Sequence, residues 1–236
     1  MDLNKVYITS DLHYAHRNVI TFSNRPFENT DEMDEALLKQ FDELPDDAVI
    51  IHNGDLFLNS RMDYEKLKNY YIPRMKSNGR KIWNIMGNHD KTAFEYVKNC
   101  PYKEPYEMYI NMGFDRVYML PILFEGKFLL SHEPVYLKPG SNLVNVYGHT
   151  HDCDIDENYF NRECENWAMM KRVKAHPELT KQTILDIDTS IKPLGLEIDL
   201  SNYFNVCWDK HHRILKWSEV TNHSKNLREQ SSSVLK

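Results

Sequence analysis

Three short apolar runs stand out in the first half of the chain, and each is followed directly by polar residues. They are Val6–Thr9, Ala48–Ile51 and Lys81–Met86, and all three are rich in β-branched side chains. Runs of this length and composition predict buried strands. The polar residues that follow them are therefore expected at strand ends.

Two longer stretches between these runs have the period of an amphipathic helix. Apolar residues recur at spacing four in 31–43, and Asn29 or Thr30 is suited to cap the start of that helix. A second helix is expected over 62–75, and a short one over 93–98. The first half of the chain therefore reads as alternating strands and helices, in the order βαβαβ.

The second half of the chain reads mostly as β-structure. Two packed sheets with helices outside would suit this order, so we predict an α+β fold of the four-layer α/β type, a two-sheet β-sandwich flanked by helices. The expected elements are a hairpin of 117–124 and 128–131, a strand at 143–147, helices over 163–173 and 177–185, and a closing hairpin of 203–208 and 213–217 around Asp209 and Lys210.

Length and composition indicate one ordinary globular domain. The chain has 236 residues, of which 41% are hydrophobic and 27% charged, and one core is expected over 1–222. Residues 152–200 exceed what that core needs and are expected to form an insertion or cap. The tail, 223–236, is polar, serine-rich and expected to be flexible.

Charge and targeting signals narrow the possible partners. The formal net charge is −6, which does not favour a nucleic-acid coat protein or a polybasic membrane binder. No apolar run approaches the roughly 18 residues that span a bilayer, and the N-terminus does not resemble a signal peptide. The four cysteines form no CxxC pair, so reduced thiols and a cytoplasmic location are expected.

The residues at the strand ends carry the candidate chemistry. Five expected strands are followed by aspartate, histidine or asparagine, and the glycines Gly54, Gly87 and Gly148 would let the chain turn sharply there. In D-x-H and H-x-H, residues two apart would leave the same face of an extended segment. The set comprises Asp11 and His13, then Asp55, then Asn88, His89 and Asp90, then His132, and finally His149 and His151.

This mixture of side chains is what a pair of divalent metal ions requires. One carboxylate can give an oxygen to each of two ions, and imidazoles and oxygen donors can complete both coordination shells. The donor set suits Mn, Fe, Zn or Ni better than Mg or Ca. We therefore expect two divalent metal ions at the strand ends, with Mn as the first choice.

The ordered motifs D-x-H, G-D, G-N-H-D, H and G-H-x-H resemble those of the calcineurin-like metallophosphoesterase superfamily. The opening Asp11-Leu12-His13-Tyr14-Ala15-His16-Arg17-Asn18 is closest to the small single-domain bacterial and phage members. The resemblance implies a β-sandwich with a dimetal site at the carboxyl ends of its strands. It also implies hydrolysis of phosphate esters by a hydroxide that bridges the two metal ions.

The resemblance further implies a role for each residue. His89 would face the scissile phosphate, where it stabilises the transition state or protonates the leaving group, and Asp90 would orient its imidazole. The first metal ion would bind Asp11, His13 and His151, Asp55 would bridge, and the second ion would bind Asn88, His132 and His149.

One motif departs from the pattern of many relatives. Protein serine/threonine phosphatases carry Gly-Asp-x-x-Asp-Arg, whereas this chain has Gly54-Asp55-Leu56-Phe57-Leu58-Asn59. The arginine that clamps phosphate in those enzymes has no counterpart here, which weighs against a phosphoprotein phosphatase. Arg17, Arg25 and His16 are the candidate substrate-binding residues in the loop after Asp11.

Three functions remain open on this basis. The first is a phosphodiesterase or phosphatase acting on a small or nucleotide-like phosphate ester. The second is a nuclease or nucleic-acid end-processing enzyme, if Arg61, Arg74, Lys76, Arg80 and Lys81 line a backbone groove; the net charge does not indicate one. The third is a non-catalytic scaffold of the same fold, although every expected ligand is present. No membrane partner is expected, and the oligomeric state is left open.

Overall fold

The computed structural model describes residues 1–57, 63–97, 100–175 and 195–224. The chain divides into two compact units, and the first comprises Met1–Val135, Asn142–Cys153 and Ser201–Lys236. The second comprises Tyr136–Ser141 and Asp154–Leu200. Every predicted metal ligand lies in the first unit.

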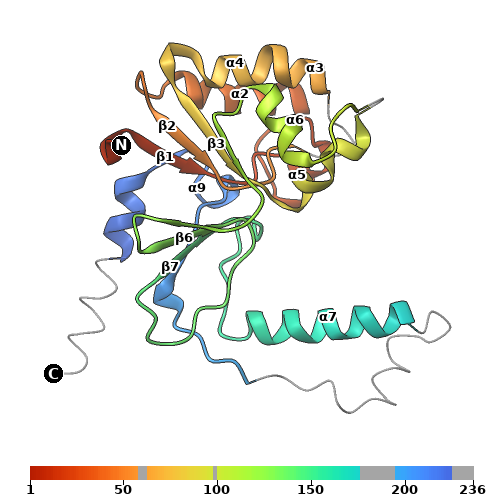
Figure 1. The fold of residues 1–236 in the computed structure, drawn as a ribbon, viewed down its shortest axis with the longest axis vertical. Coiled ribbons are helices and arrows are strands. Elements are labelled where there is room, and N and C mark those ends of the chain that lie inside the picture. The colour runs from red at the N-terminus through yellow and green to blue at the C-terminus, as the bar shows by residue number, and fades with distance from the viewer. Residues whose placement is uncertain (58–62, 98–99, 176–194, 225–236) are drawn as a thin grey trace. The chain divides into compact units, whose positions relative to one another are not determined.

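The first unit contains two mixed sheets (Figure 1). In the five-stranded sheet the order is β4-β3-β2-β1-β9; β1 to β4 are parallel and β9 is antiparallel to β1. In the four-stranded sheet the order is β5-β6-β7-β8; β6, β7 and β8 are parallel and β5 is antiparallel to β6. The strands are β1 (Val6–Thr9), β2 (Val49–His52), β3 (Lys81–Ile85), β4 (Arg116–Tyr118), β5 (Ile122–Phe124), β6 (Phe128–Ser131), β7 (Val144–Tyr147), β8 (Tyr203–Asn205) and β9 (Leu215–Lys216).

Alternating side chains of the first sheet pack into two separate hydrophobic cores. Val6 and Ile8 of β1 pack in one cluster with Leu130 and Val146 of the second sheet. Tyr7, which lies between them, packs in the other cluster, with the helices. Because successive side chains of a strand point to opposite faces, a strand buried on both faces reads as a continuous apolar run.

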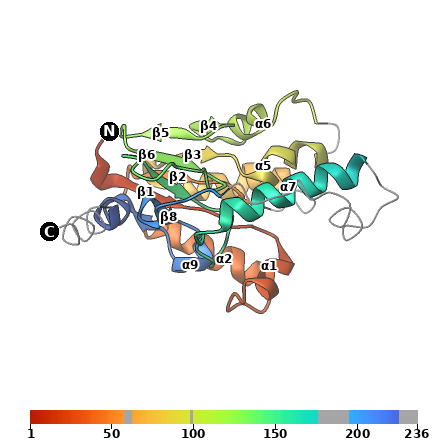
Figure 2. The same ribbon diagram turned by 90° about the horizontal axis from the view of Figure 1, so that it is seen from below.

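Helices cover the face of the first sheet that lies opposite the second sheet (Figure 1). The side chain of Asn29 accepts a hydrogen bond from Glu32 N at 2.9 Å and caps α2, as the sequence predicts. Trp208 Nε1 of α9 donates to Gln40 Oε1 of α2 at 3.1 Å, so these two helices lie side by side (Figure 2). The helices of this unit include α1 (Arg17–Phe22), α2 (Thr30–Asp42), α3 (Tyr64–Lys66), η3 (Leu67–Tyr71), α4 (Ile72–Met75), α5 (Asn88–Thr92), η5 (Ala93–Tyr96), α6 (Pro105–Met112), α9 (Trp208–His211) and the short turns η1 (Leu3–Lys5) and η4 (Ser77–Gly79). Residues 217–224 are also helical.

The predicted fold class, two sheets flanked by helices, is confirmed, and the first predicted hairpin is present as β5 and β6, although its first arm is shorter than predicted. Residues 117–124 form two strands, β4 and β5, which belong to different sheets because the chain breaks at Leu120-Pro121. The predicted closing hairpin is wrong. The short strand β8 lies in the second sheet and β9 in the first, with the helix α9 between them.

The second unit is built around α7 (Tyr159–Ala175), which begins four residues before the predicted start at residue 163. Asn161 of α7 exchanges two hydrogen bonds with the backbone of Leu196, at 3.0 and 3.1 Å. Phe160 packs edge-on against Tyr136, with ring centroids 5.5 Å apart. The predicted helix over 177–185 lies outside the described residues, and the role of 152–200 as a cap stays a prediction.

Within the described residues, no helix combines the length and the apolar character needed to cross a bilayer.

Candidate metal centre

The metal centre lies where the parallel strands of both sheets end. Asp11 and His13 follow β1, Asp55 follows β2 and Asn88 follows β3. His132 follows β6, and His149 and His151 follow β7. Because the carboxyl ends of parallel strands share one edge of a sheet, residues far apart in the sequence meet there.

Asp11, His13 and His151 form the first half-site. Each offers one ligand atom, and these atoms all lie within 4.8 Å of one another. His13 Nε2 is 3.8 Å from Asp11 Oδ1, and the rings of His13 and His151 stack with centroids 5.2 Å apart. Asp11 and His13 are buried, and His151 is partly exposed.

Asp55, Asn88, His132 and His149 form the second half-site. Asp55, His132 and His149 again place ligand atoms within 4.8 Å of one another. Asn88 Oδ1 is 3.1 Å from both His132 Nε2 and His149 Nδ1, and these two nitrogens are 3.2 Å apart. One acceptor and two ring nitrogens thus converge on a single point.

Asp55 stands between the two half-sites. Its Oδ2 is 3.3 Å from His132 Nε2 of the second half-site and 3.9 Å from His13 Nε2 of the first. Its Oδ1 accepts a hydrogen bond from His89 N at 2.9 Å, which fixes the carboxylate. This position suits the bridging role that the sequence predicts.

The local backbone differs from the extended segments expected for D-x-H and H-x-H. Asp11, His13, Asp55, His149 and His151 all have positive φ, between 51° and 72°. Non-glycine residues rarely adopt this left-handed conformation, which costs on the order of 1–3 kcal/mol each and concentrates at functional sites. The ligands therefore converge because the loops coil past the strand ends, and the prediction of extended segments is wrong.

Two glycines allow this close approach in different ways. Gly54 has a φ of +98°, a conformation that favours glycine, as the predicted sharp turn requires. Gly148 has no such φ, but a Cβ there would overlap Ser10 Oγ and Asp11 Oδ2. Position 148 therefore requires glycine because the chain packs closely against the ligand Asp11, and not because the chain turns sharply there.

Burial and charge set the protonation of the ligands. Burial alone would lower the pKa of His132, but the carboxylates of Asp11 and Asp55 outweigh it and raise the pKa to about 10. Burial lowers the pKa of His13 well below its usual range. Burial would raise the pKa of Asp11, but His132 and His13 together hold it far below its usual value. The metal-free centre thus holds a proton at His132, with which a metal ion competes.

Buried atoms without partners show that this centre fits metal ions. Asp11 Oδ1 and both ring nitrogens of His13 are buried and have no hydrogen-bond partner among the described residues. The other carboxylate oxygen, Asp11 Oδ2, accepts from Ser10 Oγ at 2.5 Å, His149 N at 2.9 Å and Cys207 Sγ at 3.0 Å. Buried polar groups are rarely left unpaired, so Oδ1 is free for an ion while Oδ2 anchors the side chain.

His89 and Asp90 differ in exposure: the side chain of His89 is partly exposed beside the centre, whereas Asp90 is buried. The side chain of His89 is 30% exposed, and its Nε2 lies 3.9 Å from Asp55 Oδ2, beside the centre. Asp90 is fully buried and accepts hydrogen bonds from Asp55 N, Leu56 N, Gly87 N and Tyr109 Oη at 2.7–3.1 Å, with a longer one from Asn84 Nδ2 at 3.3 Å. These contacts tie the Asp55 loop to the Gly87 loop, so they support a structural role for Asp90 instead of the predicted orientation of His89.

The three predicted substrate-binding residues also lie in different environments. Arg17 is exposed at the start of α1, and His16 is buried with its ring centroid 5.2 Å from that of His13. The side chain of Arg25 is fully buried and paired with Asp209. Its donors are already engaged inside the protein, which does not favour the predicted contact with substrate.

The cations considered for a nucleic-acid groove are mostly occupied elsewhere. Arg74 pairs with Glu35 at 2.7 Å and with Asp42 at 2.6 Å, and Lys76 pairs with Asp115 at 3.0 Å. Arg80 is buried and donates to the carbonyl oxygens of Met75 and Leu44. Arg61 lies outside the described residues.

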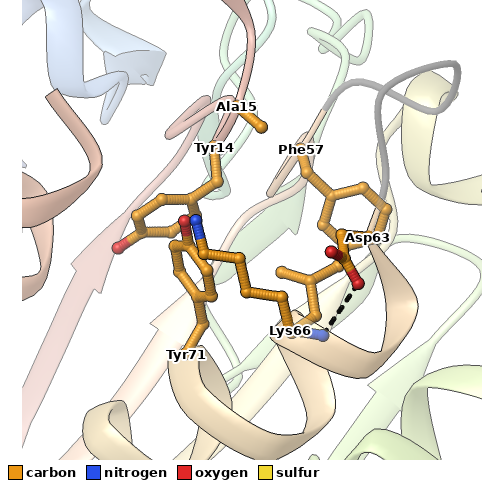
Figure 3. Close-up of a pocket in the computed structure, with 7 residues that line it drawn as sticks. Tyr14, Ala15, Phe57, Asp63, Lys66 and Tyr71 are labelled. Atoms are coloured by element: carbon orange, nitrogen blue, oxygen red, sulfur yellow. Dashed lines mark hydrogen bonds between the residues drawn. The ribbon is translucent and has the colours of Figure 1, made fainter. Parts of the chain in front are cut away.

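A small cavity adjoins the D-x-H loop (Figure 3). Tyr14, Phe57 and Tyr71 line it, and its volume is about 20 Å³. That volume is near the minimum for one water molecule and too small for an organic substrate group. Asp34 supports the same loop, since it accepts hydrogen bonds from Ala15 N at 3.0 Å and Tyr71 Oη at 2.7 Å.

Sequence reasoning missed the residues that support the ligands from behind. Asp209 was expected in a hairpin turn, yet its Oδ2 lies 2.6 Å from His151 Nδ1. Cys207 and Ser10 both bond Asp11 Oδ2, and Asn53 Nδ2 donates to Ser131 O at 2.6 Å. One signal was available: 203–208 is an apolar run followed by an aspartate, like the ligand-bearing runs.

Comparisons with known proteins agree with the geometry. The family model described as calcineurin-like phosphoesterase matches residues 4–198. An uncharacterized protein of Methanocaldococcus jannaschii is 35% identical over 106 residues, which cover 44% of this chain and 57% of that protein. The match thus spans little more than half of that relative's length. A crystal structure of a protein of unknown function from Aquifex aeolicus shares the fold, with a TM-score of 0.51 and 19% identity over 92% of this chain and 97% of that one.

Proposed function

The chain belongs to the calcineurin-like phosphoesterase family, and we propose that it hydrolyses a phosphodiester or phosphomonoester on a small or nucleotide-like group. The observation that carries this proposal is the convergence of the two half-sites on Asp55, with His89 beside them. Six candidate ligand side chains around one bridging carboxylate, next to a partly exposed imidazole, suit phosphoryl chemistry better than a structural metal site.

The half-sites are the residues that would hold two divalent metal ions. When bound, such ions activate a water molecule and stabilise charge on the phosphate oxygens. Imidazole nitrogens outnumber carboxylates in the combined set, which supports Mn, Fe, Zn or Ni, with Mn as the first choice for assay.

His89 is the group in this chain best placed to move a proton. Its Nε2 lies within 4 Å of Asp55 Oδ2 while 30% of its side chain stays exposed, so it can reach a substrate above the half-sites. In the proposed reaction His89 donates a proton to the leaving-group oxygen of the ester, a role that typically contributes 10²–10⁴-fold in rate.

The two alternative functions receive less support. A nuclease would need a basic surface, and Arg74, Lys76 and Arg80 already have partners within the described part of the chain. A scaffold without activity has no need for a complete ligand set or an accessible histidine.

The test is hydrolysis of bis-p-nitrophenyl phosphate and p-nitrophenyl phosphate after Mn is added to metal-stripped protein. We expect turnover that depends on metal, and a loss of roughly 10²–10⁴-fold in kcat for His89→Ala with metal binding retained.

His212→Asn is the matched control, because His212 is exposed and left-handed with a φ of 55°, a conformation that asparagine tolerates. The control variant should behave like the wild type. Two bound metal ions without turnover of either ester would favour the scaffold instead.

A further inference from the structure

Asp209 lies behind the first half-site, although it is 58 residues from His151 in the sequence. Its Oδ2 is 2.6 Å from His151 Nδ1, and its side chain is fully buried. Because a carboxylate only accepts hydrogen bonds, this contact requires the proton on Nδ1 and leaves the Nε2 lone pair for a metal ion.

Arg25 holds this carboxylate in place. Its Nε donates to Asp209 Oδ1 at 2.6 Å and its Nη2 to Oδ2 at 2.8 Å, a bidentate pair. The same guanidinium donates to the carbonyl oxygens of Asp11 at 2.7 Å and Leu12 at 2.8 Å. One side chain therefore links the D-x-H loop to the support of His151.

The chain around Asp209 contacts both ligand loops of the first half-site. Asn205 Nδ2 donates to the carbonyl oxygens of His151 and Cys153, each at 3.0 Å. Cys207 Sγ donates to Asp11 Oδ2 at 3.0 Å, and Trp208 N to Ser10 O at 3.0 Å. This segment begins at the last residue of β8 and lies beyond residue 198, where the family match ends.

The second half-site is supported differently. His132 Nδ1 faces the main-chain carbonyl oxygen of Asn53 at 3.0 Å instead of a carboxylate. A carboxylate partner makes an imidazole a stronger ligand than a neutral carbonyl does, and outer partners of this kind typically change metal affinity 10–100-fold.

We propose that Asp209, held by Arg25, is a positioning residue that fixes the tautomer of His151 and selectively strengthens metal binding at the first half-site. The inference rests on the metal binding assumed in the proposed function, but it concerns affinity rather than hydrolysis.

The test isolates each half-site in the full-length protein. Asn88→Ala disables the second half-site, and His13→Ala disables the first. Mn²⁺ binding to metal-stripped protein is then followed from the electron paramagnetic resonance signal of the free ion. Adding Asp209→Asn should weaken binding about 10–100-fold in the Asn88→Ala background and less than about threefold in the His13→Ala background.

A second variant removes the risk that Asp209→Asn leaves Arg25 buried without a countercharge. Arg25→Met combined with Asp209→Leu replaces the ion pair by apolar side chains of similar size, a change that is often neutral for folding. It should give the same selective loss. Asp115→Asn is the control, since Asp115 pairs with Lys76 and accepts from Ile82 N at 2.7 Å, at the opposite end of β3.

Two results would overturn the proposal: unchanged affinity at the isolated first half-site in the double variant, or an equal loss in both backgrounds. These results are independent of catalysis. Selective loss of binding in a protein that hydrolyses no ester would leave this inference standing while the proposed function fails.

Discussion

Each half-site contains one aspartate and two histidines, with Asn88 added in the second, but the two rest on different supports. His151 of the first half-site contacts a buried carboxylate from a segment that follows β8, whereas His132 of the second contacts a main-chain carbonyl of the loop after β2. The first therefore depends on a distant side chain, and the second on the backbone of a neighbouring strand end. Ligand identity alone does not show how firmly each half-site is held.

The largest effect is expected from the residue that joins the half-sites. The two carboxylate oxygens of Asp55 lie near His13 Nε2 and His132 Nε2 and accept a hydrogen bond from His89 N. Asp55→Asn replaces one of these oxygens by an amide nitrogen and leaves a single oxygen. Losing the bridge should lower phosphodiester hydrolysis by roughly 10³-fold or more, since metal-centred stabilisation amounts to several kcal/mol. The variant should bind fewer than two Mn²⁺ ions by elemental analysis. Two tightly bound ions in this variant would show that the half-sites are independent.

The next largest effect concerns how the unfolding free energy of the metal-free protein depends on pH. The pKa of His132 is raised to about 10, so its contribution is complete below its unfolded value near 6.5 and is lost as pH rises toward 10. Burial also raises the pKa of Cys207, which acts in the same direction at alkaline pH. The lowered pKa values of His13 and His149 act in the opposite direction, costing stability as pH falls below about 6.5.

Metal-free protein should therefore be most stable near neutral pH and lose roughly 2–4 kcal/mol between pH 7 and 10. Urea unfolding across this range provides the measurement. His132→Gln should remove most of the alkaline loss, and bound metal should do the same by displacing the proton. A flat profile for the metal-free wild type would contradict the assignment of the proton to His132.

Close packing at the first half-site should be sensitive to a single methyl group. In Gly148→Ala the new Cβ meets Ser10 Oγ and Asp11 Oδ2, so we expect a loss of about 2 kcal/mol in unfolding free energy and weaker metal binding at the first half-site. Gly126→Ala, which meets nothing within 4 Å but has a φ of +64°, should cost about 1 kcal/mol from backbone conformation alone. Equal losses in both variants would rule out the proposed overlap.

The smallest effect concerns backbone strain in the loop of the first half-site. Ala15 is not a ligand but shares the left-handed conformation of its neighbours, with a φ of 59°. Ala15→Gly should stabilise the protein by about 0.5 kcal/mol, because relief of strain outweighs the greater entropy of the unfolded chain. Ala93→Gly, at a helical φ of −57°, should instead destabilise it by about 1 kcal/mol. Destabilisation by both variants would refute the strain at Ala15.

The sequence was most informative where local pattern and structure coincide. The strands before Asp11, Asp55 and Asn88 are buried on both faces, so their apolar runs mark them clearly, and the polar residues after them reach one edge. The ligand motifs could be found for the same reason.

The predictions that were wrong or incomplete concern features that depend on contacts between residues far apart in the sequence. The segments 203–205 and 215–216 are short β-like runs near a turn, and local pattern cannot show that they join different sheets. Asp209 was missed because its partners, Arg25 and His151, are far away in the sequence. The left-handed ligand loops were missed because only long-range contacts can hold aspartate and histidine in that conformation.

If the proposed function is right, the two half-sites act as one hydrolytic centre. The most direct test is the rate of bis-p-nitrophenyl phosphate hydrolysis measured against the number of Mn²⁺ ions bound per chain. We expect little activity while the first ion binds and a steep rise in the rate as the second binds. Full activity with one ion bound, or none with two, would contradict it.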